Sequence, residues 1–216
     1  MKHLMKTVAG NCRQAVVVSV VLMLLCGLAY PLAMTGISAV MFPNQATGSL
    51  VQMDGKTIGS ALVGQEFTQD YYLWGRPSAY HYNTYTTDGQ GNQVYSDGTL
   101  FTGLGSGSAN LAPTNPELKQ RVQQDMQAFL EKNPEVQPQQ IPTDLLTSSG
   151  SGLDPHISVQ AAQIQVPRIA KASGLSEQQV QEIIQNHTTG KLAGTFGEKT
   201  VNVLLVNLDI TKAMES

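Results

Sequence analysis

The chain of 216 residues is long enough for one domain of ordinary size and a short additional segment, which argues against a multidomain protein. Residues 1–14 carry three basic side chains and no acidic one, whereas the rest of the chain carries ten Lys and Arg against sixteen Asp and Glu. Because a nucleic-acid-binding domain normally has a basic surface, this acidic excess argues against nucleic-acid partners.

The first predicted element is a membrane-spanning helix at residues 15–36. Residues 15–34 form an apolar run, and no charged residue stands between Arg13 and Asp54. Twenty helical residues span about 30 Å, the thickness of the hydrocarbon core of a bilayer. The alternative is a cleaved signal peptide, whose apolar region is normally only about 7–15 residues long. We therefore predict an uncleaved anchor.

Four positions in this helix are candidate contacts with partner helices. Small residues let two helices approach closely, and an aromatic residue followed by proline is typical of a kink near the membrane interface. These positions are Gly27, Tyr30, Pro31 and Gly36.

The basic flank predicts the orientation of the anchor. Lys and Arg within about 15–20 residues of a span are retained on the cytoplasmic side. We therefore predict a cytoplasmic N-terminus at residues 1–14 and an exported domain at residues 37–216, which in a bacterium is periplasmic. Both cysteines precede this domain, so its core must hold it together without a disulfide. The basic residues are Lys2, Lys6 and Arg13.

The sequence pattern of the exported part, residues 37–216, predicts a small α+β domain. A short strand is expected at residues 58–64, and then a long excursion to Leu111 with one hairpin, because turn dipeptides such as Asp88-Gly89 flank short β-prone segments. The apolar run at residues 201–210 predicts a central strand.

Three helices are also expected, each beginning with a capping residue. They are a helix from Asn115 to Asn133, a helix from Ser158 to Gly174 that is interrupted at Pro167, and a helix that begins at the capping box of Ser176 and Gln179.

The sequence contains no recognisable catalytic motif. Gly55-Lys56-Thr57 resembles the end of a phosphate-binding loop, but Leu50 stands where its first glycine is required. The exported histidines, His81, His156 and His187, have no evident nucleophile partner and lack the spacing of a zinc site. We therefore predict no catalytic residue, no metal site and no cofactor bound by this chain alone.

A helix-turn-helix pattern offers an alternative function. Residues 168–184 have turn and apolar residues such as Gly174 and Val180 at the spacings of this motif, which would make the chain a membrane-anchored DNA-binding regulator. Its second helix carries Glu177 and Glu182 but no Lys or Arg, so phosphates would be repelled. Two packed helices joined by a glycine turn are the favoured interpretation.

Seven motifs, taken in order, resemble the C chain of the Kdp potassium-transporting ATPase. The resemblance covers nearly the whole chain, from the anchor to Leu208, although the excursion from Tyr80 to Thr102 is longer than the family pattern. The motifs are Gly48-Ser49-Leu50, residues 59–67, Gly75-Arg76-Pro77-Ser78-Ala79, Asn110-Leu111 with residues 115–118, residues 151–158, residues 166–170 and Val201-Asn202-Val203-Leu204.

The resemblance implies a non-catalytic accessory subunit of a high-affinity, ATP-driven potassium uptake pump in a bacterial inner membrane. Its implied partners are a potassium-conducting, channel-like chain, a P-type ATPase catalytic chain and a small single-span stabilising chain. The family is described as a catalytic chaperone that raises the ATP affinity of the catalytic chain. ATP and potassium would then belong to the complex, and an exported domain would affect ATP binding through coupling between two states of that complex.

The loop from Ser151 to Ser158 is the candidate assembly or ion-mouth element. A carboxylate at the outer mouth of the channel-like chain would raise the local cation concentration, which makes Asp154 the expected functional centre. The structural alternative is that Asp154 accepts backbone N–H bonds as a turn cap. The candidate residues are Gly152, Leu153, Asp154, Pro155 and His156.

Overall fold

The computed structural model describes residues 2–191 and 194–215, with side chains from residue 11 onward. Contacts between residues divide the chain into two units, Met1–Leu50 and Val51–Ser216. The predicted segments 1–14 and 37–216 include Met1, residues 192–193 and Ser216, which lie outside the described residues, as do the side chains of Lys2 and Lys6.

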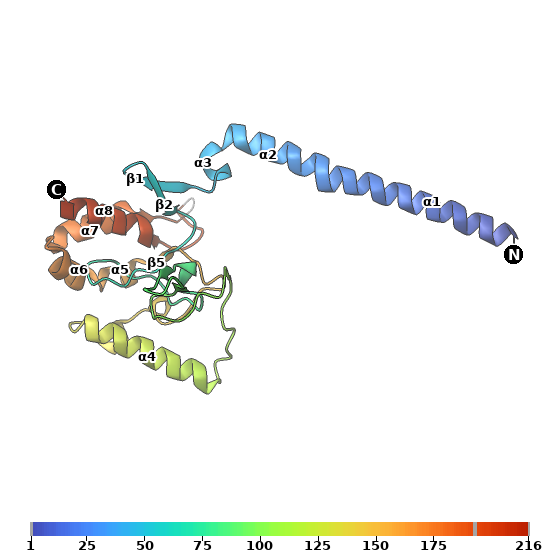
Figure 1. Ribbon diagram of the computed structural model, residues 1–216. Helices are drawn as coiled ribbons and strands as arrows, with labels where there is room; N and C mark the ends of the chain where they lie inside the picture. The colour runs from blue at the N-terminus through green and yellow to red at the C-terminus, as the bar shows by residue number, and fades with distance from the viewer. Residues whose placement is uncertain (1, 192–193, 216) are drawn as a thin grey trace. The chain divides into compact units, whose positions relative to one another are not determined.

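The N-terminal unit is one long helical rod followed by a short turn of helix (Figure 1). An 18-residue window within Asn11–Met41 has a mean hydropathy of 2.4, and the segment is long and apolar enough to cross a membrane. The predicted N-terminal apolar helix is therefore confirmed, and it continues beyond residue 36 to Met41. The rod consists of α1 (Lys2–Leu24), the π-helical turn η1 (Leu25–Ala29) and α2 (Tyr30–Met41), and α3 (Pro43–Ala46) follows.

Pro31 explains the π-helical turn. Because proline has no N–H, it cannot donate to the carbonyl of Gly27 as another helical residue would. The preceding amide, that of Tyr30, donates to Leu25 O, five residues back, which widens the helix at this point. The irregularity predicted at Tyr30-Pro31 is thus a wide turn on the N-terminal side of the proline.

The second unit contains small sheets, as an α+β domain requires. β2 pairs with β1 around the Asp54-Gly55 turn and covers only the first part of the strand predicted at residues 58–64. The hairpin predicted in the long excursion is β3 with β4. A third sheet has the antiparallel order β5-β7-β6. The strands are β1 (Leu50–Met53), β2 (Lys56–Ser60), β3 (Thr86–Thr87), β4 (Gln93–Val94), β5 (His156–Ser158), β6 (Thr188–Thr189) and β7 (Thr200–Asn202).

The predicted helix caps are present in the structure. The side chains of Asn115 and Ser158 accept N–H bonds at the starts of α4 and α5, and Ser176 and Gln179 form the reciprocal capping box of α7. Gly174 ends α6 with a left-handed φ of 79°. The helices of this unit are η2 (His81–Asn83), α4 (Pro116–Lys132), η3 (Pro138–Gln140), η4 (Thr143–Leu145), α5 (Val159–Gln163), α6 (Val166–Ser173), α7 (Glu177–Asn186) and α8 (Val203–Glu215).

Two local predictions are wrong. The strand predicted at residues 201–210 ends at Asn202, whose side chain accepts the N–H of Leu205 at 3.1 Å and so caps α8. A short apolar run does not distinguish a buried strand from a buried helix, and here the helix buries one face. Conversely, His156–Ser158 forms β5 where a loop is predicted, because β7 offers it an edge. The buried residues of α8 are Val203, Leu204, Val206, Asn207 and Ile210.

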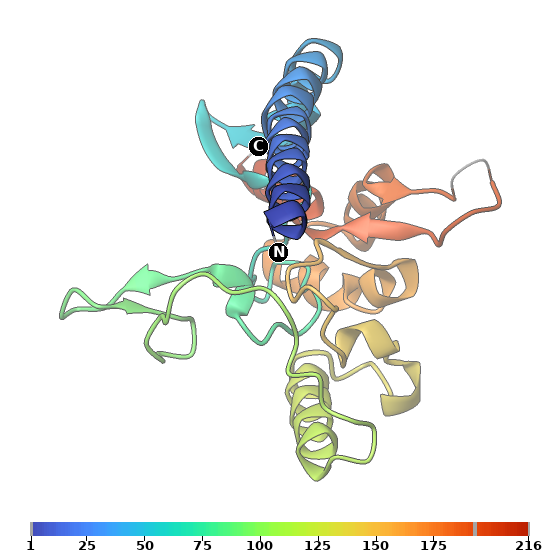
Figure 2. The same ribbon diagram turned by 90° about the vertical axis from the view of Figure 1, so that its right-hand side faces the viewer.

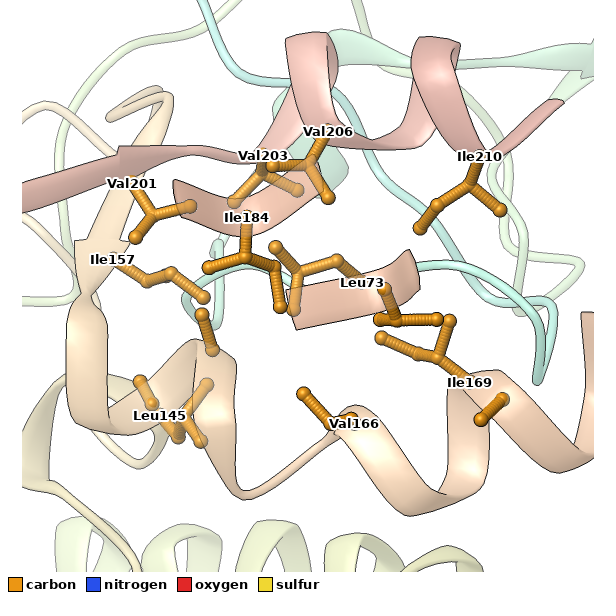
Figure 3. Close-up of a cluster of buried hydrophobic side chains, with 14 of the residues drawn as sticks. Leu73, Leu145, Ile157, Val166, Ile169, Ile184, Val201, Val203, Val206 and Ile210 are labelled. Carbon is orange, nitrogen blue, oxygen red and sulfur yellow. The ribbon is translucent and has the colours of Figure 1, made fainter. Parts of the chain in front are cut away.

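The core of the second unit forms where three helices and the third sheet meet (Figure 3). Side chains from α6, α7 and α8 point toward one another and toward Leu73, which lies on an extended segment and is fully buried. The labelled core residues are Leu73, Leu145, Ile157, Val166, Ile169, Ile184, Val201, Val203, Val206 and Ile210.

Two buried amide side chains fix the segment that leads to the candidate site. Asn207 accepts the N–H of Leu73 at 2.7 Å and donates to its carbonyl at 2.9 Å. Gln165 makes the same pair of bonds with Trp74, at 2.9 and 3.2 Å. Because the segment is bonded to α8 on one side and to the α5–α6 connection on the other, the residues that follow it start from a fixed position.

Candidate functional site

The predicted loop belongs to a junction of loops from distant parts of the chain. Backbone bonds hold the junction together: Gly64 N–H donates to Leu153 O at 2.9 Å, and Gly107 N–H donates to Ser151 O at 2.7 Å. These bonds tie residues 151–153 to two segments that are distant in the sequence. We define this loop junction as Gly64, residues 75–83, residues 105–107 and residues 147–156.

Gly152 is required in the junction for two reasons. Its φ of 66° lies in the left-handed region, where a residue other than glycine costs about 1–2 kcal/mol. A Cβ atom at this position would lie 2.4 Å from Gly107 O, far inside van der Waals contact. Gly150 has neither constraint. Gly152 thus permits the close approach of residues 105–107.

Asp154 is bonded to its own chain. Its Oδ1 accepts the N–H of His156 at 3.0 Å, and its Oδ2 accepts a bond from Arg76 Nη1 at 3.3 Å. Arg76 also donates from Nε to Thr147 O at 3.2 Å, so its guanidinium bridges Thr147 and Asp154. The turn cap proposed as the structural alternative is therefore observed, and the carboxylate has a cationic partner.

The remaining loop residues lead into the third sheet. Leu153 and His156 are half-buried and Pro155 is buried. His156 starts β5 opposite Asn202, and its Nδ1 lies 3.5 Å from Asp154 Oδ1. The structure thus gathers the five predicted residues into one turn at the edge of the core.

Ser78 and Tyr82 bind the junction from the other side. The Ser78 hydroxyl donates to Gly152 O at 2.7 Å and accepts the N–H groups of Tyr80 and Tyr82, each at 3.2 Å. Tyr82 is 8% exposed, and its hydroxyl donates to Arg76 O at 2.8 Å. Burial raises the pKa of Tyr82 to about 12, because the phenolate would be poorly solvated there.

Three consecutive residues of the junction have a left-handed backbone. His81, Tyr82 and Asn83 have φ values of 46°, 55° and 57°, and conformations of this kind cost about 1–3 kcal/mol each unless the surroundings enforce them. Asn83 exchanges two hydrogen bonds of 2.9 Å with Gly105. His81 Nδ1 lies 2.7 Å from Glu66 Oε1. The strained turn is therefore held on both sides.

A pocket of about 310 Å³ opens beside the junction. Its lining is largely aromatic and aliphatic, with the charged side chains of Glu66, Arg76 and Asp125. The described residues that line it include no histidine or cysteine. Across residues 11–191 and 194–215, no group of three or more His, Cys, Asp or Glu side chains is placed to hold a metal ion.

No sequence pattern predicts the individual roles of Arg76, Ser78 and Tyr82. The motif at residues 75–79 contains Arg76 and Ser78 but not Tyr82, and these residue types indicate no chemistry until their hydrogen-bond partners are known. Arg76 and Asp154 are separated by 78 residues, so their pairing depends on the tertiary fold.

The four predicted helix-packing positions lie on the N-terminal rod. Gly27 falls within η1 and Gly36 within α2, and a Cβ atom at either position would meet nothing within 4 Å. Tyr30 and Pro31 begin α2, and Tyr30 is 65% exposed. Within this unit all four positions are open to a neighbouring helix.

The region with the helix-turn-helix pattern forms two packed helices. α6 and α7 are joined by the turn at Gly174, and Val180 and Ile184 of α7 are buried in the core. The exposed residues of α7 include Glu177 and Glu182. The packing interpretation accounts for the pattern, because the apolar spacing serves the core of this unit.

Comparisons with known proteins agree on one family. A family model described as "K+-transporting ATPase, c chain" matches residues 12–212. The chain is 54% identical to a potassium-transporting ATPase KdpC subunit of Clostridium kluyveri, with 97% of each chain covered. It is 49% identical to the protein of the same name from Clostridioides difficile, covering 94% of this chain and 97% of the other. For the protein of that name from Caldanaerobacter subterraneus the identity is 42%, covering 91% and 92%.

Proposed function

The chain belongs to the family of the C chain of the K+-transporting ATPase, and we propose that it is a non-catalytic accessory subunit of a high-affinity, ATP-driven potassium uptake pump. The observation that carries this proposal is the extent of the similarity, because the match to a chain named as a subunit covers 97% of both proteins. The loop junction supports it, since its polar groups bond to one another rather than forming a reactive centre.

We place the chain in a bacterial inner membrane as a single-pass protein. Residues 1–14 lie in the cytoplasm, residues 15–36 span the bilayer, and residues 37–216 form the periplasmic part. The positive flank and the length of the apolar helix support this placement.

We assign three partners to the chain: a potassium-conducting, channel-like chain, a P-type ATPase catalytic chain and a small single-span chain. Gly27, Tyr30, Pro31 and Gly36 are the positions at which the anchor packs on partner helices, since small residues allow close approach. ATP-binding and potassium belong to the assembled pump. A periplasmic domain raises the ATP affinity of the catalytic chain by stabilising one of two states of the complex.

The expected phenotype is a loss of growth at limiting potassium. The whole pump, expressed in a strain that lacks other potassium uptake, should restore growth when this chain is present and fail when it is deleted. Growth at high external potassium should not depend on the chain. Full growth at limiting potassium without the chain would contradict the proposed function.

The loop around Asp154 is proposed to face the outer mouth of the potassium-conducting chain. Asp154→Asn keeps the oxygen that accepts the His156 N–H but removes the charge, so potassium affinity should fall at low ionic strength and recover as salt screens the field. The measurement is potassium-dependent ATPase activity of the purified pump. Asp70→Asn, which removes a charge from a separate ion pair with Lys132, is the control. Equal potassium affinity in the Asp154→Asn and control pumps would leave Asp154 with its structural role alone.

A further inference from the structure

Residues 84–104 project from the second unit as an arm (Figure 2). We call this segment the arm. It is a small meander, in which β3 pairs with β4 and the chain then returns so that Phe101 N–H donates to Gln93 O at 2.9 Å. Val94 and Tyr95 are buried within it, at 8% and 7% exposed. The arm is therefore folded.

An aromatic row joins the arm to the loop junction. The rings of Tyr85 and Phe101 lie 4.5 Å apart between centroids, and those of Phe101 and Tyr95 lie 5.4 Å apart. Tyr95 stacks on His81 at 4.9 Å. Because aromatic pairs at these separations are favourable, the row stiffens the arm along its length.

Both ends of the arm are clamped. The chain enters after Asn83 and leaves before Gly105, and these two residues exchange two hydrogen bonds. His81, just before the entry, has Nε2 at 3.6 Å from Asp97 Oδ2 of the arm. An element that is ordered before binding loses less conformational entropy when it docks. The strained turn at residues 81–83 thus supports a preorganised projection.

The arm exposes large apolar side chains. Leu104 is 84% exposed, Leu100 is 64% exposed and Tyr85 is 48% exposed. Single exposed apolar residues are normal on a protein surface, so it is their concentration, three within residues 84–104, that makes the arm a candidate for contact with another molecule.

The negative charge of the arm limits which kinds of surface it can bind. Its charged residues are Asp88 and Asp97, and it contains no Lys, Arg or His. A hydrogen bond from the Asn92 side chain lowers the pKa of Asp88, and one from the Thr99 hydroxyl lowers the pKa of Asp97. Both carboxylates are anionic at neutral pH. An anionic lipid surface and the arm of a second copy would both repel them.

We propose that the arm is a docking element that inserts Leu100 and Leu104 into an apolar groove, rimmed by Lys or Arg side chains, on another subunit of the same pump. The inference rests on the proposed function, because it takes its partner from the pump. It goes further by naming the element of this chain that makes the contact and the chemistry of the surface that receives it.

The first test is site-specific photo-cross-linking in membranes that contain the complete pump. Benzoylphenylalanine placed at position 104 of the full chain should form a covalent product with one pump subunit, identified by mass spectrometry. A product with a second copy of this chain, a product with lipid, or no product would each overturn the proposal. The same probe at Leu62, which is 60% exposed outside the arm, is the matched control and should not give that product.

The second test is co-purification of the pump from detergent. Leu100→Lys and Leu104→Lys should each lower the amount of partner subunits recovered with the tagged chain by at least tenfold, because a charge is forced into the groove. Leu62→Lys should not. Far-ultraviolet circular dichroism and a thermal melt establish that each variant is folded. Recovery of partners with both arm variants at the wild-type level would overturn the proposal, whereas failure of the wild-type chain to recover partners would overturn the proposed function itself.

Discussion

At the scale of single residues, Gly152 and Gly150 form a natural pair for testing the junction. Gly152→Ala should lower the free energy of unfolding by about 2 kcal/mol or more, because it combines an unfavourable φ with a clash against Gly107 O. Gly150→Ala has open space around it and should change stability little. Chemical denaturation of the full chain in detergent measures both, and equal effects would contradict the role of Gly152.

Tyr82 gives the junction a predicted pH dependence. The folded chain keeps the phenol protonated to about pH 12, whereas the unfolded chain releases the proton near pH 10. The folded chain therefore has its full stability with respect to this group below pH 10. Between pH 10 and about pH 12 the unfolded chain has lost the Tyr82 proton and the folded chain has kept it, so the free energy of unfolding should fall by about 1.4 kcal/mol per pH unit. Tyr82→Phe loses the bond to Arg76 O, at a cost of about 1 kcal/mol, and should show a shallower alkaline decline. Denaturation curves from pH 9 to 12 measure the difference, and parallel declines would refute this assignment.

At the scale of elements, the free-energy cost of inserting the anchor into a membrane should depend strongly on where along it a charged residue is introduced. Leu24 lies in the interior of Asn11–Met41, so Leu24→Arg should cost about 2.5–3.5 kcal/mol of membrane insertion. Val40 lies at the end of the same segment, where a long side chain can reach the membrane interface. Val40→Arg should therefore cost much less insertion free energy than Leu24→Arg. The fraction of chain recovered in membranes measures insertion. Similar losses for both variants would mean that residues 15–36 are not the span.

At the scale of the whole molecule, the proposed topology can be tested directly. Protease added to intact spheroplasts should digest the second unit and leave the N-terminal segment protected, because the basic flank is retained in the cytoplasm. N-terminal sequencing of the untreated protein should show that the anchor is kept. A second unit that resists protease until the membrane is permeabilised would reverse the orientation, and an N-terminus at Tyr30 would indicate a cleaved signal peptide.

The sequence by itself determined the features that depend on neighbouring residues. The apolar run produced the N-terminal helix, and the caps at Asn115, Ser158 and Ser176 each act within three residues of their own helix start. These signals are local, so no tertiary contact is needed to interpret them. The ordered motifs also sufficed to place the chain in its family.

Only the tertiary structure decided the features that depend on distant partners. Val203 and the residues after it form α8 rather than a strand because one helical face fits against the other core helices, which apolar content alone cannot show. The candidate loop was located from sequence, but its bond to Arg76 and its support by Ser78 and Tyr82 were not. Arg76 and Asp154, and likewise Ser78 and Gly152, lie more than 70 positions apart in the sequence, and folding alone brings them within hydrogen-bond distance.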